Sequence, residues 1–431
     1  MRTVVVEHLA RVEGHGGITV ELDGDAVTNV RFDVFEGSRL LEQLVRGKRF
    51  DEVAPILSRI CSICSVAHVL TSLKATENAF GVRISPQTEL LRELLFRGES
   101  IESHALHVFL LAMPDYWDYP SATAMAVDKP HAVMLGLRLK KLGNLIQETI
   151  GGRAIHPVNA VPGGFGKAPS VDQLIALRGA LIDGMKDSDT VLDLMASLPA
   201  ANFCHCDTAY AALFSPNVDS YYAGDQVMVS SNGGELALVN ASDYRTLANE
   251  RPAPHSHAKH SSFRGKPFMV GSLARLTVNP RRLAGRTAAA MERLQLQAPT
   301  SNPMDNNKAQ ALELVRDVER ALEIVEQLLR EGVRDERPVC VRPRAASGTG
   351  ITEAPRGLLI HSYTYDADGR ITAADVITPT ALNAADMELR FRRTVEECAE
   401  REEAVIAKRL QMVARAYDPC ISCSVHLVRI R

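Results

Sequence analysis

Near its N-terminus the chain contains the stretch Arg59-Ile60-Cys61-Ser62-Ile63-Cys64-Ser65-Val66-Ala67-His68, and near its C-terminus it contains Asp418-Pro419-Cys420-Ile421-Ser422-Cys423-Ser424-Val425-His426. Two residues separate the cysteines of each pair, so both sulfurs can reach one metal ion. At the start of a helix, unpaired backbone N–H groups and the helix dipole would also lower the pKa of a thiol. The two pairs together therefore predict a site of four thiolates for a soft metal ion.

A structural zinc ion is the common occupant of two Cys-x-x-Cys pairs, and this interpretation stays open. Against it, structural zinc ligands usually close a short loop within one small module, whereas Cys64 and Cys420 lie near opposite ends of the chain. The end of the chain would have to fold back onto its beginning. A thioredoxin-like redox site fits poorly, because neither pair follows a βαβ pattern.

The composition is that of an ordinary globular protein. Of its 431 residues, 46% are apolar and 23% are charged, and the eight cysteines are too sparse for a disulfide framework. With 49 basic and 52 acidic residues the net charge is −3, which argues against a surface for nucleic acid or anionic membranes. No apolar run approaches the roughly 18–20 residues of a membrane span, and the first residues lack the order of a signal peptide. We therefore expect a cytoplasmic protein.

Hydrophobic periodicity predicts an α+β fold, with a core of long helices and small peripheral β-sheets. Strands are expected at Thr3–Val6, Gly17–Leu22, Val27–Phe35, Gly357–Tyr365 and Arg370–Ile377. Helices are expected at Val66–Phe80, Pro86–Met113 and Lys308–Arg330, with a last charged helix that Asn383 caps and that ends near Tyr417. Stretches rich in glycine and proline interrupt these elements at Gly151–Gly166, Arg251–Gly271 and Arg342–Gly357. Since no clear linker divides the chain, residues 1–426 are expected to form a single domain.

The two cysteine stretches resemble the first and last motifs of the large subunit of nickel–iron hydrogenases. Further stretches with the same resemblance follow in the family's order: Arg11-Val12-Glu13-Gly14-His15, Glu42-Gln43-Leu44-Val45-Arg46-Gly47-Lys48, Gly151-Gly152-Arg153-Ala154-Ile155-His156-Pro157, Glu353-Ala354-Pro355-Arg356-Gly357 and Pro379-Thr380-Ala381-Leu382-Asn383. Together they cover most of the chain. The resemblance therefore implies the fold of a nickel–iron hydrogenase large subunit.

The resemblance also implies a set of metal ligands. Nickel would be bound by Cys61, Cys64, Cys420 and Cys423. Of these, Cys64 and Cys423 would bridge to an iron that carries carbon monoxide and cyanide. Glu42 and His426 would bind a second metal ion, magnesium or another divalent ion, that ties down the end of the chain. Residues 427–431 would be an extension that a maturation endopeptidase removes after nickel-insertion factors have loaded the site.

Other motif residues would act around this cluster. Cys420 would take a proton from H2 as a base, and Glu13 would relay that proton onward. Arg356 would lie over the cluster, where its permanent charge stabilises developing negative charge. Thr380 would donate a hydrogen bond to a cyanide, and His68, one helical turn beyond the first cysteine pair, could bond a cluster sulfur. The remaining motif residues expected beside the cluster are Asp418, Pro355 and Pro379.

These roles imply the catalytic subunit of a cytosolic hydrogenase that cleaves H2 heterolytically and reversibly. The chain has no cysteine set for iron–sulfur clusters, so electrons would leave through an iron–sulfur small subunit. Flavin-containing, diaphorase-type subunits would then reduce NAD(P)+. Departures from the respiratory branch, such as Ser103 and Ala381-Leu382, favour the NAD(P)- or deazaflavin-coupled branch. Two alternatives stay open: an H2 sensor, or a non-catalytic four-cysteine scaffold related to the quinone-site subunits of complex I.

Other residues of metal-binding type are expected to be structural. Cys204 and Cys206 are too close in sequence to chelate well without further ligands. In the loop-like stretch Pro254–His260, solvated or packed histidines are commoner than ligands; the histidines are His255, His257 and His260. Cys340 and Cys398 are expected to be plain buried thiols.

Overall fold

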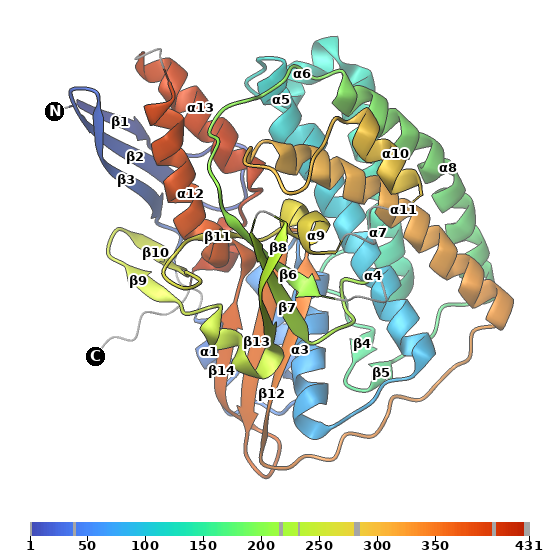
Figure 1. Cartoon of the computed structure of the whole chain (residues 1–431). Coiled ribbons are helices and arrows are strands. Elements are labelled where there is room, and N and C mark those ends of the chain that lie inside the picture. The colour runs from blue at the N-terminus through green and yellow to red at the C-terminus, as the bar shows by residue number, and fades with distance from the viewer. Residues whose placement is uncertain are drawn as a thin grey trace.

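The structure, a computed structural model, describes residues 2–37, 40–214, 219–231, 233–279, 285–398 and 402–425. Within these ranges, long helices occupy one side of the molecule and small sheets the other (Figure 1). The α+β class expected from the sequence is therefore confirmed. None of the described helices has the length and apolar character that crossing a membrane requires. His426 and residues 427–431 lie outside the described residues.

Long helices that pack side by side form the helical side. They are α4 (Pro86–Ala105), α7 (Pro130–Gly151), α8 (Val171–Ala196) and α11 (Asp305–Glu331). Helix α4 packs against α7 and α11, and α8 packs against the same two helices. A Cβ atom on Gly143 of α7 would lie 2.5 Å from Gly98 O on α4, so glycine at this crossing lets the two helices touch.

Periodicity located two of these helices. The predicted helix Lys308–Arg330 is α11, which extends it by a few residues at its start. The predicted stretch Pro86–Met113 is helical throughout, but α4 passes into a π-helix, η2 (Leu106–Ala112), before α5 (Met113–Tyr116). Helix α8 was not predicted, although Ser170 and Gln173 form a capping box at its start.

Helix α3 (Ser65–Phe80), which follows the first cysteine pair, lies on an antiparallel sheet of β12 (Ala346–Ala354), β13 (Gly357–Tyr365) and β14 (Ile371–Ile377). Strand β12 was expected to be irregular, and this was wrong. A Cβ atom on Gly348 or Gly350 would come within 2.5 Å of the α3 backbone. These glycines interrupt the sequence pattern that would predict a strand, and they also let the strand approach the helix closely.

A second antiparallel sheet contains β1 (Arg2–Val6), β2 (Gly16–Asp23) and β3 (Ala26–Val34), as predicted to within a residue or two. Helices α12 (Pro379–Glu396) and α13 (Glu403–Ala416) pack on it (Figure 1). The prediction of one last helix capped by Asn383 was therefore wrong. Asn383 lies inside α12, buried, where its Oδ1 accepts the N–H of Val270 at 2.8 Å.

Shorter elements complete the described part of the chain: α1 (Leu41–Leu44), α2 (Val53–Leu57), η1 (Ser58–Ile60), α6 (Ala122–Asp128), β4 (Ala160–Val161), β5 (Gly164–Phe165), β6 (Ala209–Phe214), β7 (Gln226–Ser231), β8 (Gly234–Asn240), η3 (Ala241–Thr246), β9 (Arg251–Ala253), β10 (Ser256–His260), β11 (Phe268–Met269), α9 (Ser272–Val278), α10 (Arg286–Arg293) and α14 (Ile421–Ser424). The sheet of order β11-β6-β7-β8 and the β9–β10 hairpin were not predicted from the sequence.

Candidate metal centre

The two cysteine pairs meet in the interior. Cys61 Sγ lies 3.3 Å from Cys420 Sγ, and Cys64 Sγ lies 3.4 Å from Cys423 Sγ. The four sulfurs all lie within 4.8 Å of one another, and none of these residues is more than 5% exposed. All four are free thiols. The sequence expectation that both pairs form one site agrees with this geometry.

The first pair sits at the start of a helix. Cys61 follows η1, and Cys64 is the N-cap residue of α3. The backbone N–H groups of Ile63 and Cys64 point to Cys61 Sγ at 3.3 and 3.5 Å. The N–H groups of Val66 and Ala67, in the first turn of the helix, have no partner within it and donate to the buried carboxylate of Glu99 at 2.7 and 3.0 Å. Helix geometry therefore fixes this pair and directs positive dipole toward its sulfurs.

The second pair is held by the N-terminal part of the chain. Glu13 and Cys420 form a parallel β-bridge, and Glu13 O accepts the N–H of Ile421 at 2.9 Å. The Glu13 carboxylate lies 3.1 Å from Cys420 Sγ and also bonds the backbone N–H and the hydroxyl of Ser422. Thr380 Oγ1 accepts the N–H of Cys420 at 2.9 Å. This bond uses the hydroxyl as an acceptor and leaves its hydrogen to be directed elsewhere.

Buried thiols this close together cannot all ionise without a cation. Hydrogen bonds, first from Cys420 and then from Cys423, hold the pKa of Cys61 well below its usual value. Burial raises the pKa of Cys420 and of Cys423 well above it. For Cys64, bonds from Cys420 and Cys423 favour the thiolate, but Cys61 and burial outweigh them and raise its pKa to about 11. A bound metal ion would replace these protons and stabilise the thiolates. Metal binding at this site would therefore be coupled to the release of protons.

Arg356 supplies a fixed positive charge to the four-cysteine site. Its Nε donates to Asp418 O at 2.7 Å, and its Nη2 lies 3.0 Å from Asp418 Oδ1. Burial opposes the charge, but Asp418 and the thiolates of Cys420 and Cys61 outweigh it and hold the pKa of Arg356 well above its usual range. Its Nη1 is buried without a hydrogen-bond partner among the described residues. This nitrogen can therefore bond a negatively charged group beside the sulfurs.

Beside Cys423, His68 begins a buried chain of hydrogen bonds. Its Nε2 lies 3.8 Å from the sulfur of Cys423, not of Cys64. Its Nδ1 bonds His361 Nε2 at 3.1 Å, and His361 Nδ1 bonds the hydroxyl of Tyr363 at 2.6 Å. Neither His361 nor Tyr363 stands in a motif that predicted a site residue. Alternation along the predicted strand Gly357–Tyr365 could have placed both on one face, but nothing local indicated what that face touches.

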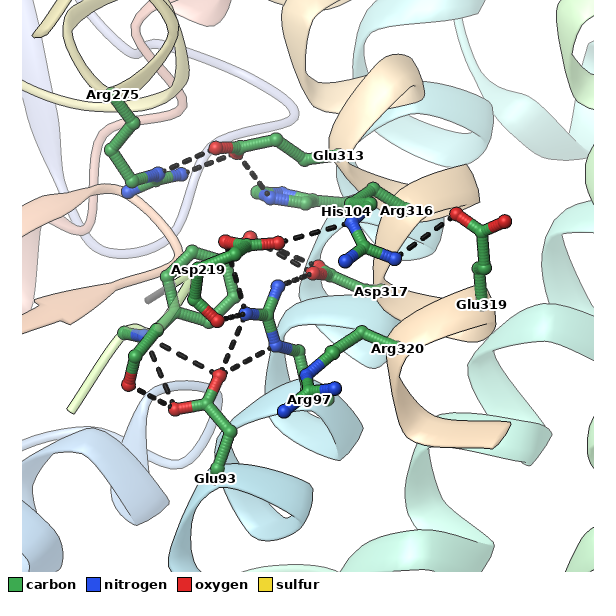
Figure 2. A network of polar contacts seen from close by, with 12 residues as sticks. Glu93, Arg97, His104, Asp219, Arg275, Glu313, Arg316, Asp317, Glu319 and Arg320 are labelled. Carbon is green, nitrogen blue, oxygen red and sulfur yellow. Dashed lines mark hydrogen bonds and ion pairs between the residues drawn. The ribbon is translucent and has the colours of Figure 1, made fainter. Parts of the chain in front are cut away.

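Arg275, part of a network of buried charges (Figure 2), bonds the backbone of the two residues before Arg356. Arg275 donates to Ala354 O at 2.9 Å and to Pro355 O at 2.8 Å, and it forms an ion pair with Glu313 of α11. Further along the network, Arg97 of α4 bonds Asp317 of α11 at 2.6 Å. In Figure 2, Glu93 of α4 and Asp317 of α11 point toward Arg97, whereas Glu313 of α11 points toward Arg275 of α9. The network thus fixes the backbone that precedes Arg356 relative to the long helices.

The other predicted site residues take different positions. Pro379 is the first residue of α12 and is buried. Glu42 lies on α1, where its Oε1 accepts the N–H of Val376 at 2.7 Å. Its predicted partner His426 lies outside the described residues, so the second metal site stays a prediction.

The cysteines outside the centre are placed as follows. Cys204 is buried, and its Sγ donates to Arg390 O at 2.9 Å. Cys206 is partly buried, and Cys398 is buried as predicted. Cys340, predicted to be buried, is exposed. It lies in an irregular segment before β12 that periodicity does not describe.

Comparison with known proteins identifies the family. A family model described as nickel-dependent hydrogenase matches residues 39–145 and 216–426, most of the chain. The chain belongs to the nickel-dependent hydrogenase family. A second model, described as HoxL-like, matches residues 3–36 of this hydrogenase.

Individual relatives agree over the full length. The hydrogenase is 38% identical to sulfhydrogenase 1 subunit alpha of Pyrococcus furiosus, over 99% of this chain and 98% of the relative. It is 35% identical to sulfhydrogenase 2 subunit alpha of the same organism, over 99% and 100%. Its structure resembles a chain of an NAD+-reducing [NiFe]-hydrogenase in the H2-reduced state, with a TM-score of 0.87 and 27% identity over 99% and 100%. The protein is thus a hydrogenase, an oxidoreductase that acts on H2. Its family and its fold are those that the sequence motifs predicted.

Proposed function

We propose that this chain is the catalytic large subunit of a hydrogenase whose H2-splitting centre is bound by Cys61, Cys64, Cys420 and Cys423. The observation that carries the proposal is the cluster of four buried sulfurs within 4.8 Å of one another. In a nickel-dependent family, these four thiolates would hold a nickel–iron centre, with Cys64 and Cys423 as the ligands that both metals would share.

The surrounding residues also fit such a centre. Nickel and iron require soft, negatively charged ligands, and four thiolates supply them. Iron-bound cyanide requires hydrogen-bond donors, and the buried Nη1 of Arg356 and the hydroxyl of Thr380 lie beside the sulfurs with hydrogen-bonding capacity not used by the contacts described. A structural zinc ion has no such requirement. The donors beside the sulfurs therefore favour the nickel–iron centre over the zinc scaffold.

When bound, the metal pair would supply the redox chemistry that polarises H2. The chain's own residues would then handle the proton. Cys420 Sγ lies one hydrogen bond, 3.1 Å, from Glu13 Oε2, so a proton on that sulfur can pass to the carboxylate. Arg356 holds a fixed positive charge beside the thiolates and orients Asp418, which stabilises the charged form of the site. His68 would bond the sulfur of Cys423 and keep its orientation through His361.

The remaining parts of the enzyme are proposed on chemical grounds. Electrons would leave through an iron–sulfur small subunit, a partner that the subunit names of the relatives support. The structural likeness to an NAD+-reducing enzyme supports NAD(P)+ as the final acceptor, reached through flavin-containing subunits. Glu42 and His426 would bind magnesium or another divalent ion. Cleavage after His426 by a maturation endopeptidase stays a prediction.

Infrared spectroscopy of the anaerobically purified complex tests this proposal. Metal-bound carbon monoxide and cyanide absorb where protein groups do not, so a carbon monoxide band with two cyanide bands is the expected result. A processed, metal-loaded complex without these bands would contradict the nickel–iron assignment. Zinc in place of nickel in the same sample would establish the structural zinc site instead.

A further inference from the structure

Outside the four-cysteine site, three other side chains of metal-binding type come together. They are His255 at the turn of the β9–β10 hairpin, His260 at the end of β10, and Glu388 on α12. One donor atom from each lies within 4.8 Å of the others. The side chains are only 25%, 14% and 19% exposed, respectively, so the cluster is largely shielded from solvent.

Hydrogen bonding explains only part of this cluster. His255 Nε2 bonds Glu388 Oε1 at 2.7 Å. His260 Nδ1, however, lies 3.7 Å from Glu388 Oε2, too far for a hydrogen bond. Its other nitrogen, Nε2, is buried without a hydrogen-bond partner among the residues that the structure describes. Two donors that share a tetrahedral zinc ion lie about 3.3 Å apart. The gap between His260 and Glu388 is therefore close to the separation that a shared ion would impose.

The carboxylate is also held from outside the cluster. Glu388 Oε1 accepts the backbone N–H of Phe32 on β3 at 2.8 Å. Metal-binding carboxylates commonly have such a fixed partner, which sets their orientation. Strand β10, which supplies His260 and directly follows His255, packs against both β3 and α12, and β3 packs against α12. The elements that supply His260, the carboxylate and its partner are therefore in mutual contact.

We propose that His255, His260 and Glu388 bind one divalent transition-metal ion of the zinc class. Two imidazoles and one carboxylate suit zinc or a similar first-row ion, whereas magnesium and calcium prefer all-oxygen sites. Three protein ligands leave a position for water, and the partial exposure of the side chains admits it.

The site would fix the hairpin that contacts the end of the chain. Between the two histidines, Ala258 forms an antiparallel β-bridge with Val425, two residues after Cys423. An ion between the hairpin and α12 would hold this bridge in place. The role is structural, and it is independent of the redox centre proposed above.

Metal stoichiometry tests the site. The purified hydrogenase is equilibrated with zinc, freed of loosely bound ions, and its zinc per chain is measured by mass spectrometry. His260→Ala and Glu388→Gln are each expected to bind one zinc fewer than the wild type. His257→Ala is the matched control, because His257 lies in the same hairpin but is exposed and bonds Glu36 O at 2.8 Å.

An equal zinc content per chain in the wild type and in Glu388→Gln would overturn the proposal. If His260→Ala does not fold, the result for Glu388→Gln alone decides. The four cysteines are present in every sample, so metal bound there cancels from the difference. Cobalt gives a second readout, since a site of histidine and carboxylate lacks the thiolate-to-metal charge-transfer bands of the cysteine centre. A loss of those bands in Glu388→Gln would place the missing ion at the cysteines and contradict the proposal.

Discussion

Glu13 Oε2 lies 3.1 Å from Cys420 Sγ, although 407 positions separate the two residues in sequence. The same carboxylate bonds the backbone N–H of Ser422 at 3.1 Å, and Glu13 O accepts the N–H of Ile421. Glu13 therefore both positions the second cysteine pair and is the carboxylate next to its first sulfur. The two roles can be separated by a substitution that keeps the hydrogen bonds and removes the acid.

Glu13→Gln is such a substitution. The amide oxygen can still accept from Ser422, so we expect nickel and iron content to stay at the wild-type level. The proton relay is lost, and turnover should fall by roughly 10²-fold or more, the usual contribution of a positioned acid or base. Hydrogen–deuterium exchange with H2 measures this step directly. Glu21→Gln, on the exposed face of the N-terminal sheet, is the control, and equal exchange rates in the two variants would exclude Glu13 as the relay.

Cys64→Ser and Cys423→Ser test the bridging pair. A hydroxyl is a poor ligand for soft metals and is not ionised at neutral pH, so each variant should lose activity and assemble no complete cluster. Nickel and iron per chain, measured with activity, check this outcome. Cys340→Ser removes an exposed thiol that is not part of the four-cysteine cluster, and it should change neither value. Wild-type turnover in either bridging variant would contradict the assignment.

Much of the fold was accessible from the sequence because its elements carry local signals. Helix α11 has apolar residues at spacings of three and four, and the strands β1–β3 alternate or are joined by a tight turn. Strand β12 carries no such signal, since Gly348 and Gly350 are there to let α3 approach. Asn383 looked like a helix cap, but its side chain bonds the backbone of Val270 on a distant segment. Tertiary contacts determine the structure at β12 and at Asn383, and no local sequence pattern indicates such contacts.

The residues of the site likewise include some that the sequence predicted and others that it did not. The cysteines, Glu13 and Arg356 stand in motifs and were predicted together. His361 stands in no motif, and its importance arises only because β13 brings it 3.1 Å from His68. Arg275 likewise supports the Arg356 segment through backbone carbonyls, which leave no trace in the sequence. Residues that act through another residue's backbone or ring are therefore the ones that sequence analysis misses.

His361 should make the protein sensitive to acid. Burial, and then the neighbouring His68, hold the pKa of His361 well below its usual value, so it stays neutral in the folded state while the unfolded state takes up a proton near pH 6.5. Stability from this group is therefore present above pH 6.5 and lost as the pH falls. At 1.36 kcal/mol per pH unit below pH 6.5, the loss between pH 7 and 5 can reach at most about 2 kcal/mol.

Urea unfolding of the wild type and His361→Asn at pH 7 and 5 measures this effect. The variant is expected to be less stable at pH 7, because it loses packing and hydrogen bonds, but to lose less stability than the wild type on acidification. His257→Asn changes an exposed residue, so its free energy of unfolding should match that of the wild type at both pH 7 and pH 5. An identical pH dependence in His361→Asn and the wild type would show that another group causes the acid sensitivity.

The charge network in Figure 2 predicts a contrast between two arginines. Arg97 is fully buried and bonds Asp317 at 2.6 Å and Glu93 at 2.7 Å. Arg97→Met leaves these carboxylates buried without a counter-charge, which should cost about 3–5 kcal/mol. Arg320→Met removes a pair with Glu323 that is partly exposed, and it should cost no more than about 1 kcal/mol.

Thermal unfolding of the two variants under the same conditions compares these costs. Because Arg97 joins α4 to α11, and α11 holds Arg275 through Glu313, the Arg97 variant should also disturb the segment before Arg356. Its infrared bands, measured on the fraction that stays folded, should therefore broaden, whereas those of Arg320→Met should not. Equal unfolding temperatures for the two variants would mean that the buried pairs contribute no more to stability than exposed ones. Unchanged infrared bands in Arg97→Met would mean that the network has no role in positioning Arg356.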